Sequence, residues 1–293
     1  MTAQDRVFHP STKCCSYIPI LPNFLVGGIL LDEDPQFAEG KALFQREGEK
    51  LMVTPAGVQP PWYYWWHYVD KKFGEAENLR CPYYINRDGG LCGIWRYRNS
   101  RCSTWFCKHE RGFVGMNFWA TLSDLLAGVE KKLSEWCLHE LDVQVPEQET
   151  RPREAVWGNW TGREQEFYKQ CFQKVSALNW AEVLELSGPE ATALADDALK
   201  KFQMLLSTAS IPAQLKTGNF TSENLGNDAV RVWGYRSYDP IDLPDHVIEQ
   251  IKNGDWNLLE PDLVCKLYEL QILVSAGETP ANEISKSQIE NYK

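Results

Sequence analysis

The stretch CGIWRYRNSRCSTWFC, from Cys92 to Cys107, sets the character of the N-terminal third of this chain. It carries three cysteines among aromatic and basic side chains, with Cys81 upstream and the doublet of Cys14 and Cys15 near the start. Thiolates bind zinc, copper(I) and clustered iron strongly, and four of them can complete a tetrahedral site or hold a cubane cluster. The crowding of cysteines therefore predicts an irregular, cysteine-rich metal-binding region.

The first-choice ligands are Cys81, Cys92, Cys102 and Cys107. Asp88-Gly89-Gly90 supplies a tight reversal that can bring Cys81 and Cys92 together. Successive side chains of an extended chain point in opposite directions, so Cys14 and Cys15 can both bind one metal ion only if the backbone bends. Either one of them binds while the other packs, or the site holds more than one metal. The expected cofactor is an iron–sulfur cluster, with the four-iron form favoured over zinc because the ligands lack the short CxxC spacing frequent in structural zinc sites.

Basic side chains flank these cysteines in the sequence, namely Arg80, Arg87, Arg96, Arg98, Arg101 and Lys108. Four thiolates on zinc or on an oxidised four-iron cluster leave a formal charge of about −2, which needs nearby cations and hydrogen-bond donors in an apolar site. Arg98 is the best candidate for such a donor, and Trp95 and Trp105 would keep water from the sulfurs. Two other interpretations stay open: an ordinary irregular core, and a catalytic cysteine working with His67 or His109.

The same residues resemble the closing motif of the zinc- or iron-chelating cysteine-cluster family (YkgJ type, CxxCxxCC domain), approximately C-x-I-Y-x-x-R-P-x-x-C-R-x-F-x-C. The matching positions are Cys92, Ile94, Arg98, Cys102, Phe106 or its neighbour Trp105, and Cys107. Trp95, Asn99 and Ser103 depart from the pattern, and Phe8 and Ser11 stand where the family has two further cysteines. The resemblance covers about residues 14 to 110 and implies metal binding.

The resemblance also suggests activities, because the family's relatives include flagellin lysine N-methylases. One alternative function is therefore methyl transfer from S-adenosylmethionine to a protein lysine. The nearest approach to a glycine-rich nucleotide motif, GGILLDED from Gly27 to Asp34, lacks the GxGxxG spacing. The other expectations are a redox role for an iron–sulfur cluster and a structural zinc site in an interaction module.

Composition narrows the choice of partners and compartment. A formal net charge of −10 repels phosphate backbones and anionic membranes, so a protein partner or protein substrate is expected rather than nucleic acid. The longest apolar run, Tyr17 to Leu31, contains two prolines and is shorter than the roughly 20 residues of a membrane span, so it is expected to be buried. The N-terminus shows no secretory signal pattern, which favours the cytoplasm.

The remaining sequence predicts a mainly helical α+β fold in three regions. Residues 1–112 are the cysteine-cluster region, residues 113–215 a helical region, and residues 216–293 a small winged-helix-like module with a frayed tail. Cys137, Cys171 and Cys265 lie singly in helical patterns, where a cysteine usually acts as a small buried hydrophobe.

Periodicity and capping signals place the elements. Helices are expected over residues 35–47, 118–141, 164–178, 244–252 and 261–270. A further helix is expected to start at Ser187, Pro189 and Glu190 and to continue to residue 205. The expected strands cover 50–58, 229–235 and 272–274. Thr161 and Glu164 form a capping-box signature, and residues 147–160 are the best candidate for a linker.

Overall fold

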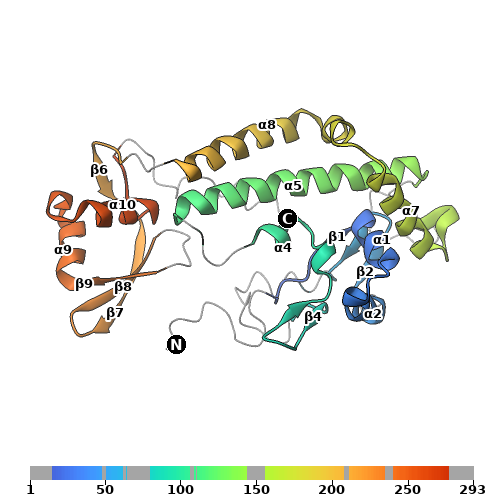
Figure 1. Cartoon of the computed structure of the whole chain (residues 1–293), viewed down its shortest axis with the longest axis horizontal. Coiled ribbons are helices and arrows are strands. Elements are labelled where there is room, and N and C mark those ends of the chain that lie inside the picture. Colours follow the sequence, from blue (N-terminus) through green and yellow to red (C-terminus); the bar gives the residue numbers. More distant parts are fainter. Residues whose placement is uncertain are drawn as a thin grey trace. The chain divides into compact units, whose positions relative to one another are not determined.

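The structure, a computed structural model, describes residues 15–47, 51–61, 64, 80–105, 109, 111–143, 156–207, 211–234 and 240–276. The fold combines helices with small antiparallel sheets, as predicted (Figure 1). Unit 1 comprises the described residues within Met1–Trp105 and Ser123–Ala195, and unit 2 those within Phe106–Leu122 and Asp196–Lys293. The helical region expected over residues 113–215 therefore contributes to both units.

Short strands and several helices build unit 1. The strands are β1 (Leu21–Pro22), β2 (Met52–Thr54), β3 (Gly57–Gln59), β4 (Tyr84–Ile85) and β5 (Leu91–Cys92). The helices are α1 (Asn23–Leu31), α2 (Ala38–Glu47), α4 (Ser100–Thr104), α7 (Glu164–Ser176) and the parts of α5 (Phe113–Glu140) and α8 (Trp180–Leu206) that fall in this unit. Single 3-10 turns are Pro35–Phe37, Trp95–Tyr97 and Gly158–Trp160. The three-stranded sheet has the order β1-β3-β2.

Helix α1 is the central element of unit 1, and most of its side chains are buried. A Cβ atom at Gly27 would stand 1.9 Å from the carbonyl oxygen of Tyr168, and one at Gly28 would stand 2.4 Å from the ring of Tyr97. The two glycines therefore let α7 and the turn at Trp95–Tyr97 approach the α1 backbone closely. The apolar run from Tyr17 to Leu31 is largely buried, as expected, and GGILLDED is a packed helix end.

Two predicted features of unit 1 differ from the structure. The single strand predicted over 50–58 is, in its described part, a hairpin of β2 and β3, because the chain reverses at Pro55-Ala56. The predicted linker at 147–160 overlaps the fold, since Trp157 is only 2% exposed and packs edge-on against Phe167. Residues 144–155 lie outside the described residues.

The predicted caps of α7 and α8 were wrong, although both helices are present. Thr161 donates its hydroxyl to the carbonyl of Gly158, and Arg163 precedes α7 without a side-chain cap. Ser187 donates its hydroxyl to the carbonyl of Val183, inside a helix that already begins at Trp180. A kink at Gly188, where φ is 75°, separates that first part of α8 from the part after Pro189.

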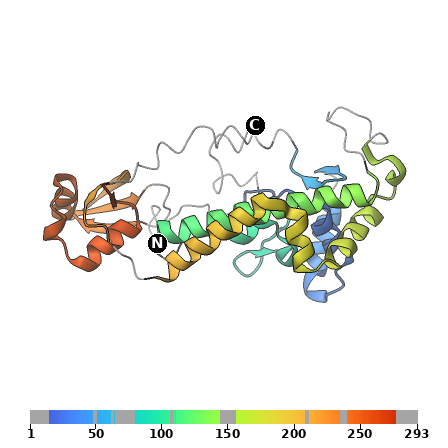
Figure 2. The same cartoon turned by 90° about the horizontal axis from the view of Figure 1, so that it is seen from above.

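Unit 2 contains the C-terminal module, which Figure 2 shows in the orange and red part of the chain. Its elements are β6 (Leu215–Thr217), β7 (Phe220–Gly226), β8 (Ala229–Gly234), β9 (Ile241–Pro244), α9 (Asp245–Asn253), the turn Trp256–Leu258, α10 (Pro261–Glu269) and β10 (Leu273–Ser275). Strands β7, β8 and β9 form an antiparallel meander, and β10 pairs with β6. The strand, two helices and final strand predicted within residues 229–274 are present, and β9, which was not predicted, lies between the first strand and α9.

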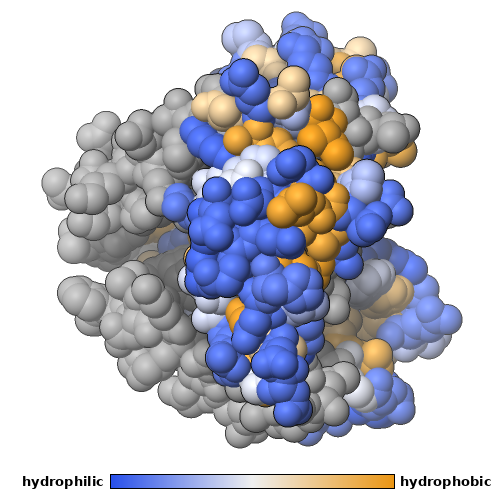
Figure 3. Space-filling model, turned by 90° about the vertical axis from the view of Figure 1, so that its left-hand side faces the viewer, coloured by the Kyte–Doolittle hydropathy of each residue, from blue (hydrophilic) through white to orange (hydrophobic). Residues whose placement is uncertain are grey.

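The face drawn in Figure 3 is mostly hydrophilic, with hydrophobic side chains only in small groups. Among the described helices, none has the length and apolar character that a membrane crossing requires.

Candidate metal centre

Four of the six cysteines proposed as ligands lie in the described part of the chain: Cys15, Cys81, Cys92 and Cys102. All four are partly buried and belong to unit 1. Cys14 and Cys107 lie outside the described residues. Tertiary contacts therefore decide how far these four thiols come together.

A backbone hydrogen bond joins the segments that carry Cys15 and Cys81. The amide of Cys81 donates to the carbonyl oxygen of Cys15 over 2.6 Å. The hydroxyl of Tyr64 donates to the carbonyl of Ser16 at 2.6 Å and accepts from the amide of Ile18 at 2.8 Å. Tyr64 is only 2% exposed, so these bonds hold the chain directly after Cys15 in place.

A hairpin connects Cys81 with Cys92. The amide of Tyr84 donates to the carbonyl of Cys81 at 3.1 Å, and Tyr84 pairs with Cys92 between β4 and β5. Asp88, Gly89 and Gly90 all have positive φ. The reversal predicted at these three residues is therefore confirmed, and it places Cys92 beside the turn that begins at Cys81.

Helix α4 presents Cys102 and is capped by Asn99. The Asn99 side chain accepts from the amide of Cys102 at 3.0 Å and donates to the carbonyl of Ile20 at 3.0 Å. Glu130, on α5, accepts two hydrogen bonds from Ser100, the first residue of α4. The position of Cys102 is thus tied both to the strand segment near β1 and to α5.

These contacts do not assemble a complete ligand set from the described residues alone. Within those ranges, no three histidine, cysteine, aspartate or glutamate side chains are grouped closely enough to hold a metal ion. A four-thiolate centre of the predicted kind would therefore need both Cys14 and Cys107, which lie outside the described residues, in addition to two described thiols. His109 is partly buried, and His67 lies outside the described residues.

Several of the flanking arginines are already neutralised by carboxylates. Arg96 contacts Asp32 at 3.0 Å and Asp34 at 2.9 Å. The bond from the amide of Gln36, together with the Arg96 contact, lowers the pKa of Asp34. Arg87 pairs with Glu39 at 3.0 Å. These ion pairs stabilise unit 1. The positive charge that a metal centre with thiolate ligands needs must therefore come from the other basic residues.

Arg98, the donor predicted from the sequence, is not part of the ion pairs that Arg96 and Arg87 form. Its guanidinium carbon lies 3.5 Å from the ring centroid of Trp95, and its buried Nε atom has no hydrogen-bond partner within the described part of the chain. Trp95 is 59% exposed and Trp105 is 42% exposed, so each presents a large face to solvent.

Tyr83 is a second donor that inspection of the sequence missed. Its side chain is 0% exposed, and its hydroxyl has no hydrogen-bond partner among the residues that the structure describes. Burial raises the pKa of Tyr83 far above its ordinary value, and the nearby Cys81 thiol raises it further. Nothing in the local sequence signals this, because the burial of a tyrosine hydroxyl depends on distant residues.

The cysteines predicted to be core residues behave as expected where they are buried. Cys137 and Cys171 are both 0% exposed, and the Cys137 thiol donates to the carbonyl of Cys171 over 3.8 Å. Hydrogen bonding with Cys137, together with burial, raises the pKa of the Cys171 thiol. Cys265, on α10, is partly buried.

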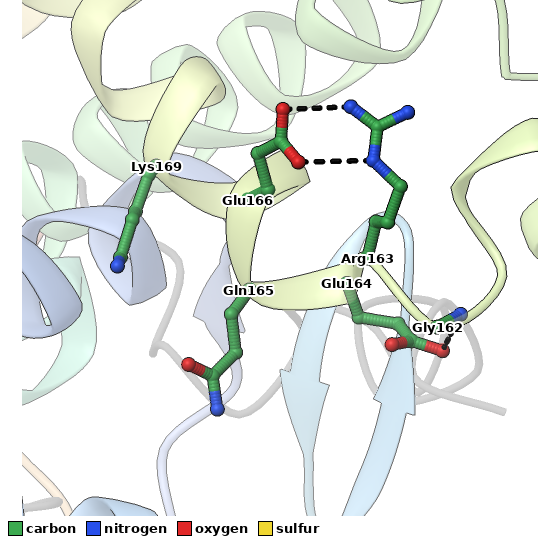
Figure 4. Close-up of a pocket in the computed structure, with 6 residues that line it drawn as sticks. All are labelled: Gly162, Arg163, Glu164, Gln165, Glu166 and Lys169. Atoms are coloured by element: carbon green, nitrogen blue, oxygen red, sulfur yellow. Dashed lines mark hydrogen bonds and ion pairs between the residues drawn. The ribbon is translucent and has the colours of Figure 1, made fainter.

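A shallow hollow at the start of α7 is lined by Gly162, Arg163, Glu164, Gln165, Glu166 and Lys169 (Figure 4). Arg163 is paired with Glu166 at 2.7 Å, and Glu164 accepts from the amide of Gly162. The pair raises the pKa of Arg163 and lowers that of Glu166. Because most of the charged side chains that line this hollow already interact within the protein, few of them remain to bind a ligand.

No family model, curated protein or solved structure matches the chain.

Proposed function

We propose that this chain is a metal-binding protein that holds an iron–sulfur cluster through its N-terminal cysteines. The ligands are drawn from Cys81, Cys92, Cys102, Cys107 and one or both of Cys14 and Cys15. When bound, such a cluster supplies one-electron transfer. The role expected of it is redox chemistry or protein modification, with a protein as partner or substrate.

The observation that carries the proposal is the 2.6 Å hydrogen bond between the backbones of Cys81 and Cys15. These residues are distant in the sequence, and the hairpin that starts at Cys81 brings Cys92 to the same part of unit 1. Thiolates are donors that iron and zinc select, and these backbone contacts bring the segments that carry three of them into one part of unit 1. The buried Tyr83 hydroxyl and the Arg98 Nε atom, which have no acceptor among the described residues, fit the second requirement, which is donors for negatively charged sulfur.

Anaerobic purification followed by absorbance, iron, sulfide and zinc analysis tests the proposal. We expect brown protein with broad absorption near about 400 nm, typical of thiolate-bound iron–sulfur centres. Colourless protein with stoichiometric zinc would establish the alternative of a structural zinc site. Protein without metal, purified without air or chelator, would refute both.

Single substitutions distinguish the ligands from bystander cysteines. We expect Cys81→Ser, Cys92→Ser and Cys102→Ser to lose bound metal, because formation of a metal site is coupled to folding of the surrounding chain. The matched controls are Cys171→Ser, in the core of unit 1, and Cys265→Ser, in unit 2. Equal metal loss in both groups would show that the ligand assignment is wrong.

Methyl transfer is the alternative enzyme function. Calorimetric titration of the metal-loaded protein with S-adenosylmethionine tests this function directly. The absence of a heat of binding would exclude methyl transfer. The winged-helix likeness of the C-terminal module stays a prediction from the sequence and plays no part in the proposal.

A further inference from the structure

Trp95 and Arg98 form a stacked pair at the surface of unit 1. The guanidinium carbon of Arg98 lies 3.5 Å from the ring centroid of Trp95, and Trp95 is 59% exposed. A guanidinium at this distance from an indole ring is held by cation–π attraction, which fixes its orientation. The pair therefore presents a large aromatic ring and an oriented cation to solvent together.

The charge of Arg98 is not compensated by any carboxylate among the described residues, although the chain carries 40 acidic side chains against 30 basic ones. Three arginines of the same region each lie within 3.0 Å of a carboxylate oxygen, namely Arg87, Arg96 and Arg101. An arginine left unpaired in an acidic protein is available to a carboxylate from outside the chain.

The guanidinium of Arg98 has a buried part and an open part. Arg98 is partly exposed, and Nε is its only side-chain nitrogen that is buried without an acceptor in the described part of the chain. The terminal nitrogens donate when an arginine binds a carboxylate end-on through two parallel hydrogen bonds. The inward Nε atom thus stays the donor invoked above for sulfur, and the terminal nitrogens are left for a ligand at the surface.

The backbone at this pair is fixed by hydrogen bonds on the side of α4. The carbonyl of Arg98 accepts from the hydroxyl of Ser103 at 3.3 Å, and the Asn99 side chain donates to the carbonyl of Ile20 at 3.0 Å. The second bond places Ile20, which is 43% exposed, next to the segment that carries Arg98. A site whose backbone is already ordered loses little conformational entropy when a ligand binds.

We propose that Trp95 and Arg98 form the docking site for an acidic segment of a protein partner. A carboxylate of that segment binds the Arg98 guanidinium, and an apolar side chain next to the carboxylate covers the Trp95 ring. Tryptophan and arginine are the residues that most often dominate the binding energy of protein interfaces. The inference does not depend on a metal centre, and it adds to the proposed function the chemistry of the expected protein partner.

Two capped peptides test the site, one with four glutamates around a leucine and one with glutamines in place of the glutamates. Each is titrated into the whole chain with nitrogen-labelled tryptophan at about 0.15 M salt, where charges more than about 8 Å apart are largely screened. The indole N–H resonance of Trp95, identified by its absence in Trp95→Phe, should shift with the glutamate peptide and stay in place with the glutamine peptide.

Substitutions at Arg98 measure the contribution of its charge. Arg98→Gln should bind the glutamate peptide roughly 10- to 100-fold more weakly, because it removes a charge-assisted hydrogen bond. Arg98→Lys keeps the charge but loses the fork of donors, so its affinity should lie between those of Arg98→Gln and the wild type.

Arg87→Gln is the matched control. It removes a positive charge from the same region, but one that Glu39 already neutralises at 3.0 Å. Its dissociation constant for the glutamate peptide should stay within about twofold of the wild-type value.

The inference would be overturned by equal affinity for the two peptides, by unchanged affinity in Arg98→Gln, or by a Trp95 resonance that does not shift. Inorganic phosphate that binds at Arg98 where the glutamate peptide does not would also overturn it. Metal analysis of the same protein is a separate readout. Protein without metal that still binds the peptide would refute the proposed metal centre alone, and metal-bearing protein that ignores the peptide would refute the docking site alone.

Discussion

Glu130 accepts two hydrogen bonds from Ser100, one from its backbone amide at 2.6 Å and one from its hydroxyl at 2.9 Å. Ser100 opens α4, the helix that carries Cys102, and Glu130 lies in the middle of α5. Burial raises the pKa of Glu130 from 4.5 to about 7, against the lowering effect of Ser100 and Arg101. A titrating carboxyl group therefore anchors the segment that holds a proposed ligand.

Stability should fall as the pH rises through the window set by Glu130. Between about pH 4.5 and pH 7 the folded state keeps a proton that the unfolded chain has released, so each step upward in pH favours unfolding. The full effect is about 3 kcal/mol. Glu130→Gln cannot ionise and should flatten this dependence, as measured by urea unfolding midpoints at pH 5, 6, 7 and 8.

Glu135→Gln is the control for that measurement, because Glu135 is an exposed carboxylate on the same helix. It should keep the slope of the wild type. If Glu130→Gln also kept that slope, another group would be responsible for the pH dependence.

Gly27→Ala should destabilise unit 1 by about 3 kcal/mol, because the new Cβ atom would overlap the Tyr168 carbonyl oxygen at 1.9 Å and force α1 away from α7. Gly128→Ala is the opposite case, since nothing lies within 4 Å of its Cβ position in α5. That variant should gain about 1 kcal/mol from helix propensity. Chemical denaturation of both variants checks the pair, and a destabilised Gly128→Ala or a neutral Gly27→Ala would contradict the packing described here.

Asn99→Ala should lower the unfolding free energy by about 2 kcal/mol, since it removes the cap on the Cys102 amide and the bond to the Ile20 carbonyl. Asn99→Ser keeps an oxygen for the cap and should lose only about half as much. Thermal unfolding compares the two variants. Equal losses would mean that the cap contributes nothing and that the bond to Ile20 accounts for the effect.

Arg111→Lys should destabilise unit 2 by about 2 kcal/mol, because a lysine cannot reproduce a forked set of charged hydrogen bonds. Arg111 contacts Glu269 at 2.7 Å and donates to the carbonyls of Met204, Leu205 and Ser207 at the end of α8. Hydrogen exchange of the last turn of α8 should therefore accelerate.

The comparison for Arg111 is Arg87→Lys, which alters an ion pair between two exposed side chains. Such pairs contribute little, so this variant should stay within about 0.5 kcal/mol of the wild type. A loss at Arg87 as large as that at Arg111 would contradict the distinction between the two sites.

Periodicity predicted the elements whose signals are local. The apolar stripe from Phe118 to Leu141 becomes α5, and the alternation at 229–235 becomes β8 as far as the described residues reach. The start of α8 was missed, although Asn179 and Glu182 form a capping box there: Asn179 accepts from the Glu182 amide, and Glu182 accepts from the Asn179 amide. Thr161 and Ser187 match the same motif, but their hydroxyls donate to backbone carbonyls instead.

The sequence by itself determined the supply of thiols, the reversal at residues 88–90 and the acidic, mainly helical character of the chain, because these depend on residue type and near neighbours. Only the tertiary structure decided that the Cys81 amide bonds to the Cys15 carbonyl, that Arg96 pairs with carboxylates, and that the Tyr83 hydroxyl is buried with no partner among the described residues. Proximity and burial arise from contacts between segments far apart in the chain. No local pattern encodes which of many such contacts will form, because that choice depends on how the whole core packs.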